Sequence, residues 1–310
     1  MKAFEVRANG KVLDYRLGKD LDLEEVGKFF RKNYNVKKIW QEKRHVVGIL
    51  EKNNVHYFLK LAPTEGISVV TQIEADWNDE FNKLVARTTE FWVPNNFDRG
   101  FYKQGLFYLI TDYFEGELLA KRPTPEKIEQ ILIEDLPKII EFGELIQNLN
   151  LTIQGLSQRE NESFLDRTKS WFNEVPQKVV KEYGVGSLLN LVENNYLKLA
   201  KKPRHGDFTP WHMFRLKNNK LGLIDGEHAM KNGVQYYDLG YLIQRVYSVM
   251  ENPAFAQTIL EELLKIGYDL EKLKVVLAAR AIGGFCDETL IRKEHDYERA
   301  NKFKEWVLAL

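Results

Sequence analysis

The spacing of apolar and polar residues changes along the chain. Between residues 35 and 62, short runs rich in valine, isoleucine and aromatic residues are separated by polar residues, which is typical of antiparallel strands joined by tight turns. Asn53 and Asn54 stand in one of these turns, where asparagine tolerates the positive φ that a two-residue hairpin loop requires. We expect three strands here, over residues 35–40, 45–52 and 55–62.

Helical spacing appears on both sides of these strands. Apolar residues recur every three or four positions over residues 20–34 and again over 67–88, where Trp77 is on the apolar stripe. Each segment is therefore expected to form a helix with one buried face. Two further strands are expected over residues 101–105 and 106–114.

From residue 125 onward the spacing predicts mainly helices, interrupted once by a hairpin. Residues 125–150 are expected to form one helix, or a pair divided at Pro137, because proline lacks the amide hydrogen of a helix interior. The hairpin consists of strands 213–216 and 221–225 on either side of an Asn-Asn turn. Further helices are expected over 160–182, 187–200 and from 236 to the last residue.

These elements predict an α+β protein with two lobes. Residues 1–114 would form a small antiparallel-sheet lobe with one long helix, and residues 115–310 a mainly helical lobe that contains the hairpin. The length of 310 residues fits two lobes, because single hydrophobic cores stop growing near this size.

Composition narrows the class of protein. The chain has 45 Lys and Arg and 45 Asp and Glu, and a net charge of zero argues against a nucleic-acid or membrane-surface binder. Cys286 is the single cysteine, so no disulfide forms within the chain, and its apolar neighbours predict a buried thiol. The first twenty residues carry charges throughout, which argues against a signal peptide. No run of 18 apolar residues occurs, so no membrane helix is expected. We expect a cytoplasmic protein.

Two aspartates at the ends of the predicted hairpin indicate chemistry. Asp207 precedes the first strand and Asp225 follows the second, and a hairpin brings its two ends together, so both carboxylates should face one cleft. Phosphoryl transfer needs one carboxylate to orient the attacking hydroxyl and another to hold magnesium. The alternative is that Gly-Asp and Asp-Gly only mark turns. The hairpin between them favours function.

Three segments in order, "HGDFTPWH", "LGLIDGEHA" and "YYDLGYL", resemble the catalytic core of the aminoglycoside phosphotransferase and choline kinase family. The resemblance implies a protein-kinase-like fold that uses ATP and Mg²⁺, with Mn²⁺ as an alternative ion. The implied acceptor is a hydroxyl of a small molecule: an aminoglycoside, an amino alcohol, a sugar or a related metabolite. It also implies that Asp207 is the catalytic base and Asp225 a metal ligand, and that His205 and Asp238 are structural.

The chain departs from the family pattern at His212, where the family usually carries a metal-binding asparagine. Magnesium prefers oxygen ligands, and imidazole suits softer metals. Three roles stay open for His212: a metal ligand, a direct phosphate contact, or a packed residue beside Trp211.

The resemblance also implies roles in the first lobe, which would bind the nucleotide. Lys60 would contact the α- and β-phosphates and pair with a glutamate on the next helix. Taken alone, a lysine at a strand end is usually a solvated charge. The spacing favours Glu74 as the partner, and Glu80 is the alternative.

The nucleotide base and the phosphates involve two further segments by the same resemblance. In "YLITDYFEG" the adenine edge would bond to backbone groups of Asp112 and Phe114, with Thr111 at the back of the pocket. The turn "QEKR" would cover the phosphates although it contains no glycine, so Lys43 and Arg44 either touch phosphate or are solvated. The solvated interpretation is favoured.

Acceptor recognition is expected in the helical lobe. Glu227, and Asp287 with Glu288 in a Gly-rich break, either bind a cationic acceptor or serve as helix caps and surface charges, and the second interpretation is favoured. Alternative functions are a nucleotide-binding pseudokinase with a regulatory role, a protein kinase and a structural scaffold. The absence of a glycine-rich loop and of D-F-G and A-P-E segments disfavours the protein kinase. Oligomeric state is not predicted.

Overall fold

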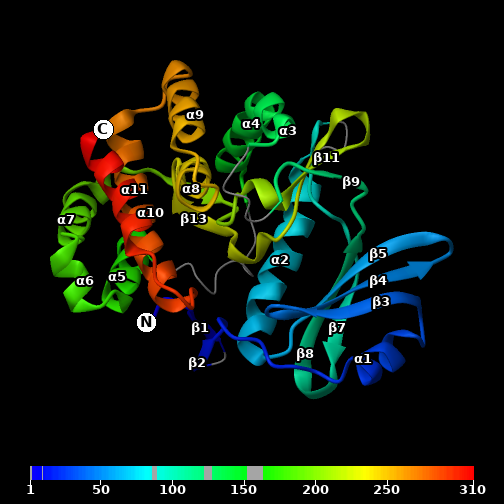
Figure 1. The fold of residues 1–310 in the computed structure, drawn as a ribbon. Helices are drawn as coiled ribbons and strands as arrows, with labels where there is room; N and C mark the ends of the chain where they lie inside the picture. Colours follow the sequence, from blue (N-terminus) through cyan, green and yellow to red (C-terminus); the bar gives the residue numbers. More distant parts are fainter. Residues whose placement is uncertain (1, 9, 86–88, 122–127, 152–162) are drawn as a thin grey trace.

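The computed structural model describes residues 2–8, 10–85, 89–121, 128–151 and 163–310. A strand-rich part formed by the N-terminal third of the chain lies beside a helical part (Figure 1). The predicted α+β class, a small antiparallel-sheet lobe joined to a mainly helical lobe, is confirmed. The predicted lobe boundary at residues 114 and 115 lies in the segment between strands β8 and β9.

The first lobe is built on a five-stranded antiparallel sheet. Its order is β3-β4-β5-β8-β7, and each strand is hydrogen-bonded to its neighbour in an antiparallel sense. Asn53 and Asn54 both have positive φ, 53° and 62°, as expected for the turn between the second and third strands. The strands are β3 (Asn35–Glu42), β4 (His45–Lys52), β5 (Val55–Leu61), β7 (Asn96–Tyr102) and β8 (Leu106–Asp112).

The strand expected over residues 101–105 was placed too late in the chain. β7 begins at Asn96, and Lys103–Gly105 is a 3₁₀ turn with Gly105 at φ 78°. Asn95, Asn96 and Gly100 read as turn residues in the sequence. In the structure the pairing with β8 overrides this local preference, and β7 is the edge of the sheet.

Two helices pack on this sheet. Helix α1 (Leu23–Phe30) begins at Asp22, whose side chain accepts hydrogen bonds from the amides of Glu24 and Glu25, and its apolar residues join Leu59 and Ile110 in one core. Helix α2 (Glu65–Leu84) packs against β8, with Ala75 beside Leu109. Since side chains alternate along a strand, residues next to Leu59 in sequence face α2.

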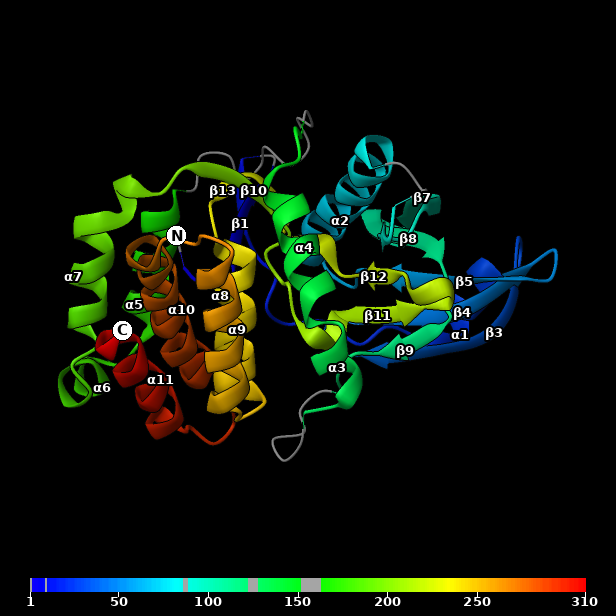
Figure 2. The same ribbon diagram turned by 90° about the horizontal axis from the view of Figure 1, so that it is seen from above.

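The second lobe is a group of helices around α10, which contacts α5, α7, α8 and α11. Phe142 and Phe208 of this lobe share a core with Trp77 and Phe81 of α2, so α2 joins the two lobes (Figure 2). The helices are α3 (Gln130–Glu134), α4 (Leu136–Gln147), α5 (Phe164–Glu174), α6 (Gln177–Glu182), α7 (Gly186–Asn195), α8 (Tyr237–Gln244), α9 (Pro253–Lys265), α10 (Leu270–Leu290) and α11 (Tyr297–Ala309).

Several predicted helix boundaries are corrected. Pro137 is the second residue of α4, so the expected division exists, but the helices separate at Asp135. The helix expected over 160–182 is broken at Pro176, and the one over 187–200 ends at Asn195. The expected helical residues 86–88, 125–127 and 160–162 lie outside the described part of the chain.

The Gly-rich break expected near residue 284 does not exist. Gly283 and Gly284 lie inside α10, which continues to Leu290. A β-carbon on Gly283 would stand 3.3 Å from the guanidinium of Arg280, so the glycine makes room for that side chain. Gly283 in the sequence therefore reflects close packing within a helix, not a turn.

The predicted hairpin is present within a larger sheet. β11 (Met213–Leu216) and β12 (Leu221–Leu223) pair antiparallel with Asn219 at φ 60° in the turn, and the sheet order is β6-β12-β11-β9. The remaining strands were not predicted: β1 (Glu5–Ala8), β2 (Lys11–Asp14), β6 (Phe91–Trp92), β9 (Gly116–Leu118), β10 (Lys201–Arg204) and β13 (Met230–Val234). In the described ranges, no helix is long and apolar enough to cross a bilayer.

Candidate active site

Asp207 lies in the loop between β10 and β11, and Asp238 of α8 holds that loop. The Asp238 carboxylate accepts hydrogen bonds from the amides of His205 and Gly206, at 2.7 and 2.8 Å. Gly206 has φ 86°, and a β-carbon there would stand 2.3 Å from the carbonyl oxygen of His228. Glycine is therefore required immediately before Asp207.

The two groups that brace this loop have shifted pKa values. Burial raises the pKa of Asp238 to about 6, although the two amide donors oppose the shift. Burial lowers the pKa of His205 to about 4, so this imidazole is neutral at pH 7. Its ring packs edge-on against Trp77 with the ring centroids 5.7 Å apart.

Asp225 follows β12 in a left-handed conformation, with φ 69° and ψ 48°. The turn that it opens is pressed against α2: a β-carbon on Gly226 would stand 2.3 Å from the indole of Trp77. This contact fixes the turn relative to α2, which also carries Glu74 one helical turn before Trp77. In the Asp-Gly-Glu sequence, packing thus requires the glycine, and its two neighbours supply carboxylates.

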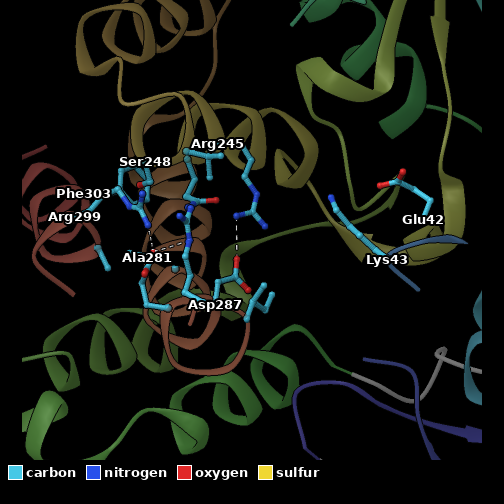
Figure 3. A pocket seen from close by; sticks show the side chains of 15 residues that line it. Glu42, Lys43, Arg245, Ser248, Ala281, Asp287, Arg299 and Phe303 are labelled. Carbon is cyan, nitrogen blue, oxygen red and sulfur yellow. Dashed lines mark hydrogen bonds and ion pairs between the residues drawn. The ribbon is translucent and has the colours of Figure 1, made fainter. Parts of the chain in front are cut away.

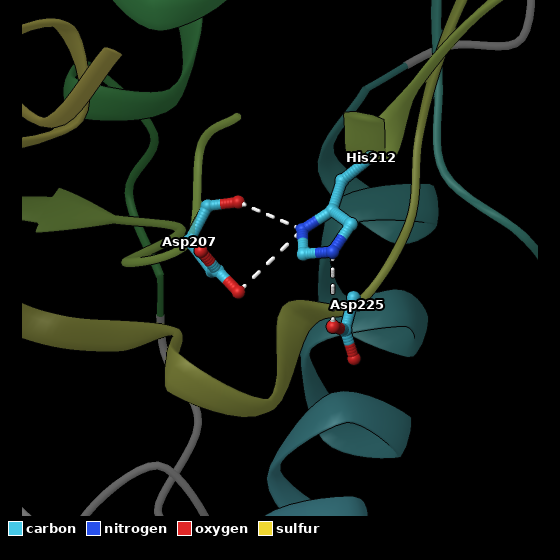
Figure 4. Close-up of side chains that lie close together, drawn as sticks. All are labelled: Asp207, His212 and Asp225. Carbon is cyan, nitrogen blue, oxygen red and sulfur yellow. Dashed lines mark hydrogen bonds and ion pairs between the residues drawn. The ribbon is translucent and has the colours of Figure 1, made fainter. Parts of the chain in front are cut away.

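His212 lies between the two aspartates (Figure 4). Its Nδ1 is 3.5 Å from Oδ2 of Asp207 and 3.2 Å from the Asp207 carbonyl oxygen, and its Nε2 is 3.4 Å from Oδ2 of Asp225. One atom from each of these three residues lies within 4.8 Å of the others. The structure therefore brings the two carboxylates together, as the hairpin predicted, with an imidazole between them.

Lys60 projects from β5 toward α2, because its neighbours Leu59 and Leu61 are buried on the α1 side of the sheet. Its ammonium contacts Oδ1 of Asp225, stands 2.6 Å from Oε2 of Glu74 and is 3.5 Å from Oε2 of Glu227. Burial by itself lowers the pKa of Lys60, but Asp225 and Glu74 raise it above the ordinary value. The lysine is therefore charged.

The two partners of Lys60 differ in their own pKa values. Burial raises the pKa of Asp225, but Lys60 and then His212 outweigh burial and hold it well below the usual range. For Glu74, burial prevails over Lys60 and the pKa is raised. Of the two candidate glutamates, Glu74 contacts Lys60, whereas Glu80 is within 3.9 Å of Lys83 one turn further along α2.

In the turn between β3 and β4, Arg44 is anchored, whereas Lys43 is exposed. Arg44 forms an ion pair with the fully buried Glu227 and donates a hydrogen bond to the carbonyl oxygen of Tyr15 at 3.1 Å. The favoured expectation that Arg44 is a solvated turn residue was therefore wrong. The physical reason is that a carboxylate 183 positions away needs a cationic partner when buried.

The residues predicted to bind adenine lie where β8 ends. Thr111 is buried, and its hydroxyl donates to the Asp112 carbonyl oxygen at 3.2 Å. The Asp112 amide donates to Asn95 at 3.1 Å, and its carboxylate accepts hydrogen bonds from the same residue. The ring of Phe114 packs on Gly222 of β12. Thr111 and Asp112 are the last residues of β8, and Phe114 lies in the segment that leads from this sheet to β9 of the other.

A cavity of about 410 Å³ opens beside Asp207, and sequence reasoning missed most of its functional side chains. Arg204, Arg245 and Arg280 reach it from β10, the end of α8 and α10. The only signal in the sequence is that arginine is uncommon at apolar helix positions, and Arg280 stands in "VVLAARAIGG".

The carboxylates considered for a cationic acceptor are all paired with basic residues. Asp287 Oδ2 accepts a hydrogen bond from Arg245 at 3.0 Å, as Figure 3 shows. Glu288 forms an ion pair with Arg299, and Glu227 with Arg44. None of the three is a surface charge, because each is a buried or partly buried partner of an arginine, and Glu288 also accepts a hydrogen bond from the amide of Asp296 at the start of α11.

A two-lobed fold in which a lysine of the sheet lobe meets a carboxylate at one end of a hairpin, with a second carboxylate at the other end, defines the kinase-like phosphotransferase class. The chain belongs to the phosphotransferase enzyme family, whose family model matches residues 45–275. A search of curated proteins found no match.

Solved structures that resemble the chain are small-molecule phosphotransferases. Aminoglycoside phosphotransferase APH(4)-Ia is 14% identical with a TM-score of 0.68, and the match covers 93% of this chain and 99% of that one. Choline kinase LicA from Streptococcus pneumoniae is 12% identical with a TM-score of 0.57, covering 93% and 99%. Spectinomycin phosphotransferase APH(9)-Ia, in complex with ADP and spectinomycin, is 12% identical with a TM-score of 0.56, covering 93% and 95%. At these identities the likeness shows the fold.

Proposed function

We propose that the protein transfers the γ-phosphate of ATP to a hydroxyl group of a small molecule, with Mg²⁺ as the metal ion. The observation that carries the proposal is the meeting of Asp207 and Asp225 on either side of His212, with Lys60 in contact with Asp225. Phosphoryl transfer requires a lysine, a metal-binding carboxylate and an acceptor-orienting carboxylate in one place. Membership of the phosphotransferase enzyme family supports the same reaction class.

The donor set fits a divalent cation. Besides Asp207, His212 and Asp225, a second group of carboxylates from Glu74, Asp225 and Glu227 lies within 4.8 Å. Oε2 of Glu227 is buried and makes no hydrogen bond, so one acceptor of this group remains unsatisfied although the Lys60 ammonium lies 3.5 Å away. Carboxylate oxygens suit Mg²⁺, and the imidazole would favour Mn²⁺ more than an amide does. Asp225, with His212 beside it, would hold the ion, which would neutralise phosphate charge when bound.

The residues of the chain would divide the remaining work. Lys60, held by Glu74, is charged and would bind the nucleotide phosphates. Asp207 would accept a hydrogen bond from the acceptor hydroxyl, orient it for in-line attack and take up its proton. The Asp238 carboxylate and Gly206 hold the Asp207 loop in place. Thr111, Asp112 and Phe114 would line the adenine site.

The wider parts of the proposal follow from these roles. The lobe formed by residues 1–114 would bind the nucleotide, and the lobe formed by 115–310 would bind the acceptor. The protein would act in the cytoplasm, where ATP is available. A regulatory pseudokinase is the second candidate, because His212 replaces the usual amide of the metal site. Asp207 and Asp225 are both retained, which favours catalysis.

The substitution Asp207→Asn tests the reaction. It keeps the size of the side chain but removes the proton acceptor, so ATP-dependent phosphorylation of a metabolite extract should fall by about 10²- to 10⁴-fold. Transfer of labelled phosphate is measured with magnesium and with manganese. The exposed Asp20, in the loop before α1, provides Asp20→Asn as the matched control with unchanged activity.

Two results would contradict the proposal. Binding of ATP by the wild type with no transfer under either metal would indicate the pseudokinase. Transfer that is equally fast in Asp207→Asn would show that this carboxylate does not act on the acceptor.

A further inference from the structure

The cavity beside Asp207 is strongly basic. Its lining contains seven Lys and Arg residues and two Asp residues. The cavity is enclosed by both lobes, and Tyr237 and Tyr241 form an aromatic wall among the arginines of the helical lobe. The charge balance of these arginines decides what kind of molecule the cavity can accept.

Arg280 is a buried cation with no carboxylate partner among the residues that the structure describes. Its side chain is 4% exposed, and its Nη1 donates to the Tyr237 hydroxyl at 3.2 Å. The guanidinium carbon lies 4.7 Å from the ring centroid of Trp171 and 4.2 Å from that of Tyr241. Its Nε makes no hydrogen bond.

Arg204 is in the same situation on the other side of Tyr237. It is 6% exposed, and its guanidinium carbon lies 3.9 Å from the Tyr237 ring centroid. Its Nε also lacks a hydrogen bond, and within the described ranges no carboxylate forms an ion pair with it. Arg204 therefore forms no ion pair, although the nearby Asp238 carboxylate balances part of its charge, and Arg280 carries an unpaired charge into the same cavity.

The third arginine is neutralised. Arg245 pairs with Asp287 at 3.0 Å (Figure 3). It also donates a hydrogen bond to the Tyr241 hydroxyl. Arg245 thus shows that a guanidinium of this lobe forms an ion pair when a carboxylate lies beside it. The contrast makes the missing partners of Arg204 and Arg280 informative.

A buried guanidinium without a counter-ion is unfavourable, because no attraction to an opposite charge offsets the free energy of its desolvation. Stacking on aromatic rings offsets part of this cost by cation–π attraction. The planar donor fork of arginine also matches the two oxygens of a carboxylate or a phosphate. An anionic ligand would supply the missing counter-ion and would accept hydrogen bonds from the guanidinium.

We infer that the phosphate acceptor is a small hydroxyl compound that itself carries a phosphate or carboxylate group, which Arg280 and Arg204 bind. This inference rests on the proposed function and specifies its acceptor. A cationic acceptor does not fit, because Asp287 is already paired with Arg245 and the remaining acid of the cavity is Asp207. The volume of about 410 Å³ suits a compact ligand such as a sugar phosphate or a hydroxy acid.

Anion binding is measured first, by the thermal shift of the full chain with inorganic phosphate or with glycerate and without nucleotide. Both probes should raise the melting temperature of the wild type. Arg280→Met should weaken binding by about 10- to 100-fold, the loss expected for hydrogen bonds to a charged group. The probe that binds more tightly identifies phosphate or carboxylate as the preferred group.

Three variants control this measurement. Arg292→Met removes an exposed arginine beyond α10 and should bind like the wild type. Lys60→Met removes the cation of the nucleotide site and should also retain the shift. Arg280→Lys keeps the charge without the planar fork and should bind with intermediate affinity, which makes the test independent of whether Arg280→Met folds.

Several outcomes would overturn the inference. They are no shift of the wild type with either probe, an equal shift in Arg280→Met, or loss of the shift in Lys60→Met alone. The last result would place the anion in the nucleotide site.

The second arm identifies the acceptor. Small metabolites from a cell extract are separated by charge, and each fraction is tested for transfer of labelled phosphate from ATP. The anionic fraction should contain the acceptor. The Arg280→Met variant should transfer less phosphate to this fraction than the wild type does. Asp207-dependent transfer to the cationic fraction would leave the proposed function standing and overturn the anionic acceptor. Anion binding at Arg280 without transfer to any fraction would contradict the proposed function alone.

Discussion

At the scale of single residues, Lys60 organises the charges around Asp225. One ammonium contacts Asp225 and Glu74 and lies 3.5 Å from Glu227. Lys60 compensates Asp225 and Glu74, whereas Glu227 is also paired with Arg44, so two cations serve these three carboxylates.

His45, next to this group, should make the stability of the protein sensitive to acid. Burial, followed by the charges of Lys60 and Arg44, lowers the pKa of His45 well below 6.5. The folded protein therefore favours the neutral imidazole, which is stabilising above pH 6.5 and costs stability as the pH falls below it. His45→Gln should reduce the loss of unfolding free energy between pH 6.5 and 5 by up to about 1.4 kcal/mol per pH unit.

Urea unfolding at several pH values measures this difference. His56→Gln, at an exposed position, controls for the substitution itself. His205 and Asp238 are present in all of these proteins, so their own titrations cancel in the comparison. Identical slopes for the wild type and His45→Gln would show that the buried imidazole does not govern the acid response.

At the scale of elements, two close packing contacts position the Asp207 and Asp225 carboxylates. The loop before β11 requires Gly206, which lies against the His228 carbonyl, and the turn after β12 requires Gly226, which lies against Trp77. The first contact links the two ends of the hairpin, because His228 ends the 3₁₀ turn that Gly226 begins, and the second links that turn to the Trp77 side chain of α2. The positions of Asp207 and Asp225 thus depend on contacts outside the two strands of the hairpin.

Gly206→Ala and Gly105→Ala separate conformational strain from steric clash. Both glycines have positive φ, 86° and 78°, but only Gly206 has atoms within 4 Å of a new β-carbon. Gly105→Ala should lower the free energy of unfolding by about 1–2 kcal/mol through backbone strain and leave phosphotransfer unchanged. Gly206→Ala should cost more and also reduce phosphotransfer, because the clash moves Asp207. Equal effects on stability and activity would contradict this account.

At the scale of the whole molecule, the two lobes are joined by charge as well as by the shared α2 core. Arg44 of the sheet lobe pairs with Glu227, which is completely buried beside Lys60. The cavity beside Asp207 is likewise formed from both lobes, with Tyr15 and Arg44 facing Arg204 and Arg280. Changes at this junction should therefore affect stability and acceptor binding together.

The Arg44 and Glu227 pair can be tested by a double-mutant cycle. Arg44→Met leaves a buried carboxylate short of its partner and should lower the free energy of unfolding by about 3 kcal/mol. In a Glu227→Gln background the same substitution should cost clearly less, since no buried charge is left unpaired. Urea unfolding of the four proteins gives the coupling energy. Additive losses would mean that the ion pair does not couple the lobes.

Local patterns in the sequence determined the α+β class, the three strands β3, β4 and β5, the helix α2 and the hairpin that carries the two aspartates. These features depend on side-chain periodicity and turn residues, which act over a few positions and can be read directly. The strands β6 and β9, two and three residues long, show no periodicity and form only because β11 and β12 pair with them.

Tertiary structure alone decided which charges meet. The sequence indicates that Asp207 and Asp225 lie near each other, because a hairpin joins them, but it contains no sign that Arg44 reaches Glu227 or that Arg204 and Arg280 enter one cavity. Their contacts arise between elements distant in the chain, after helices and sheets have packed and water has been removed. Whether a charge is paired or unpaired depends on that packing, so the chemistry of the acceptor could be inferred only from the folded molecule.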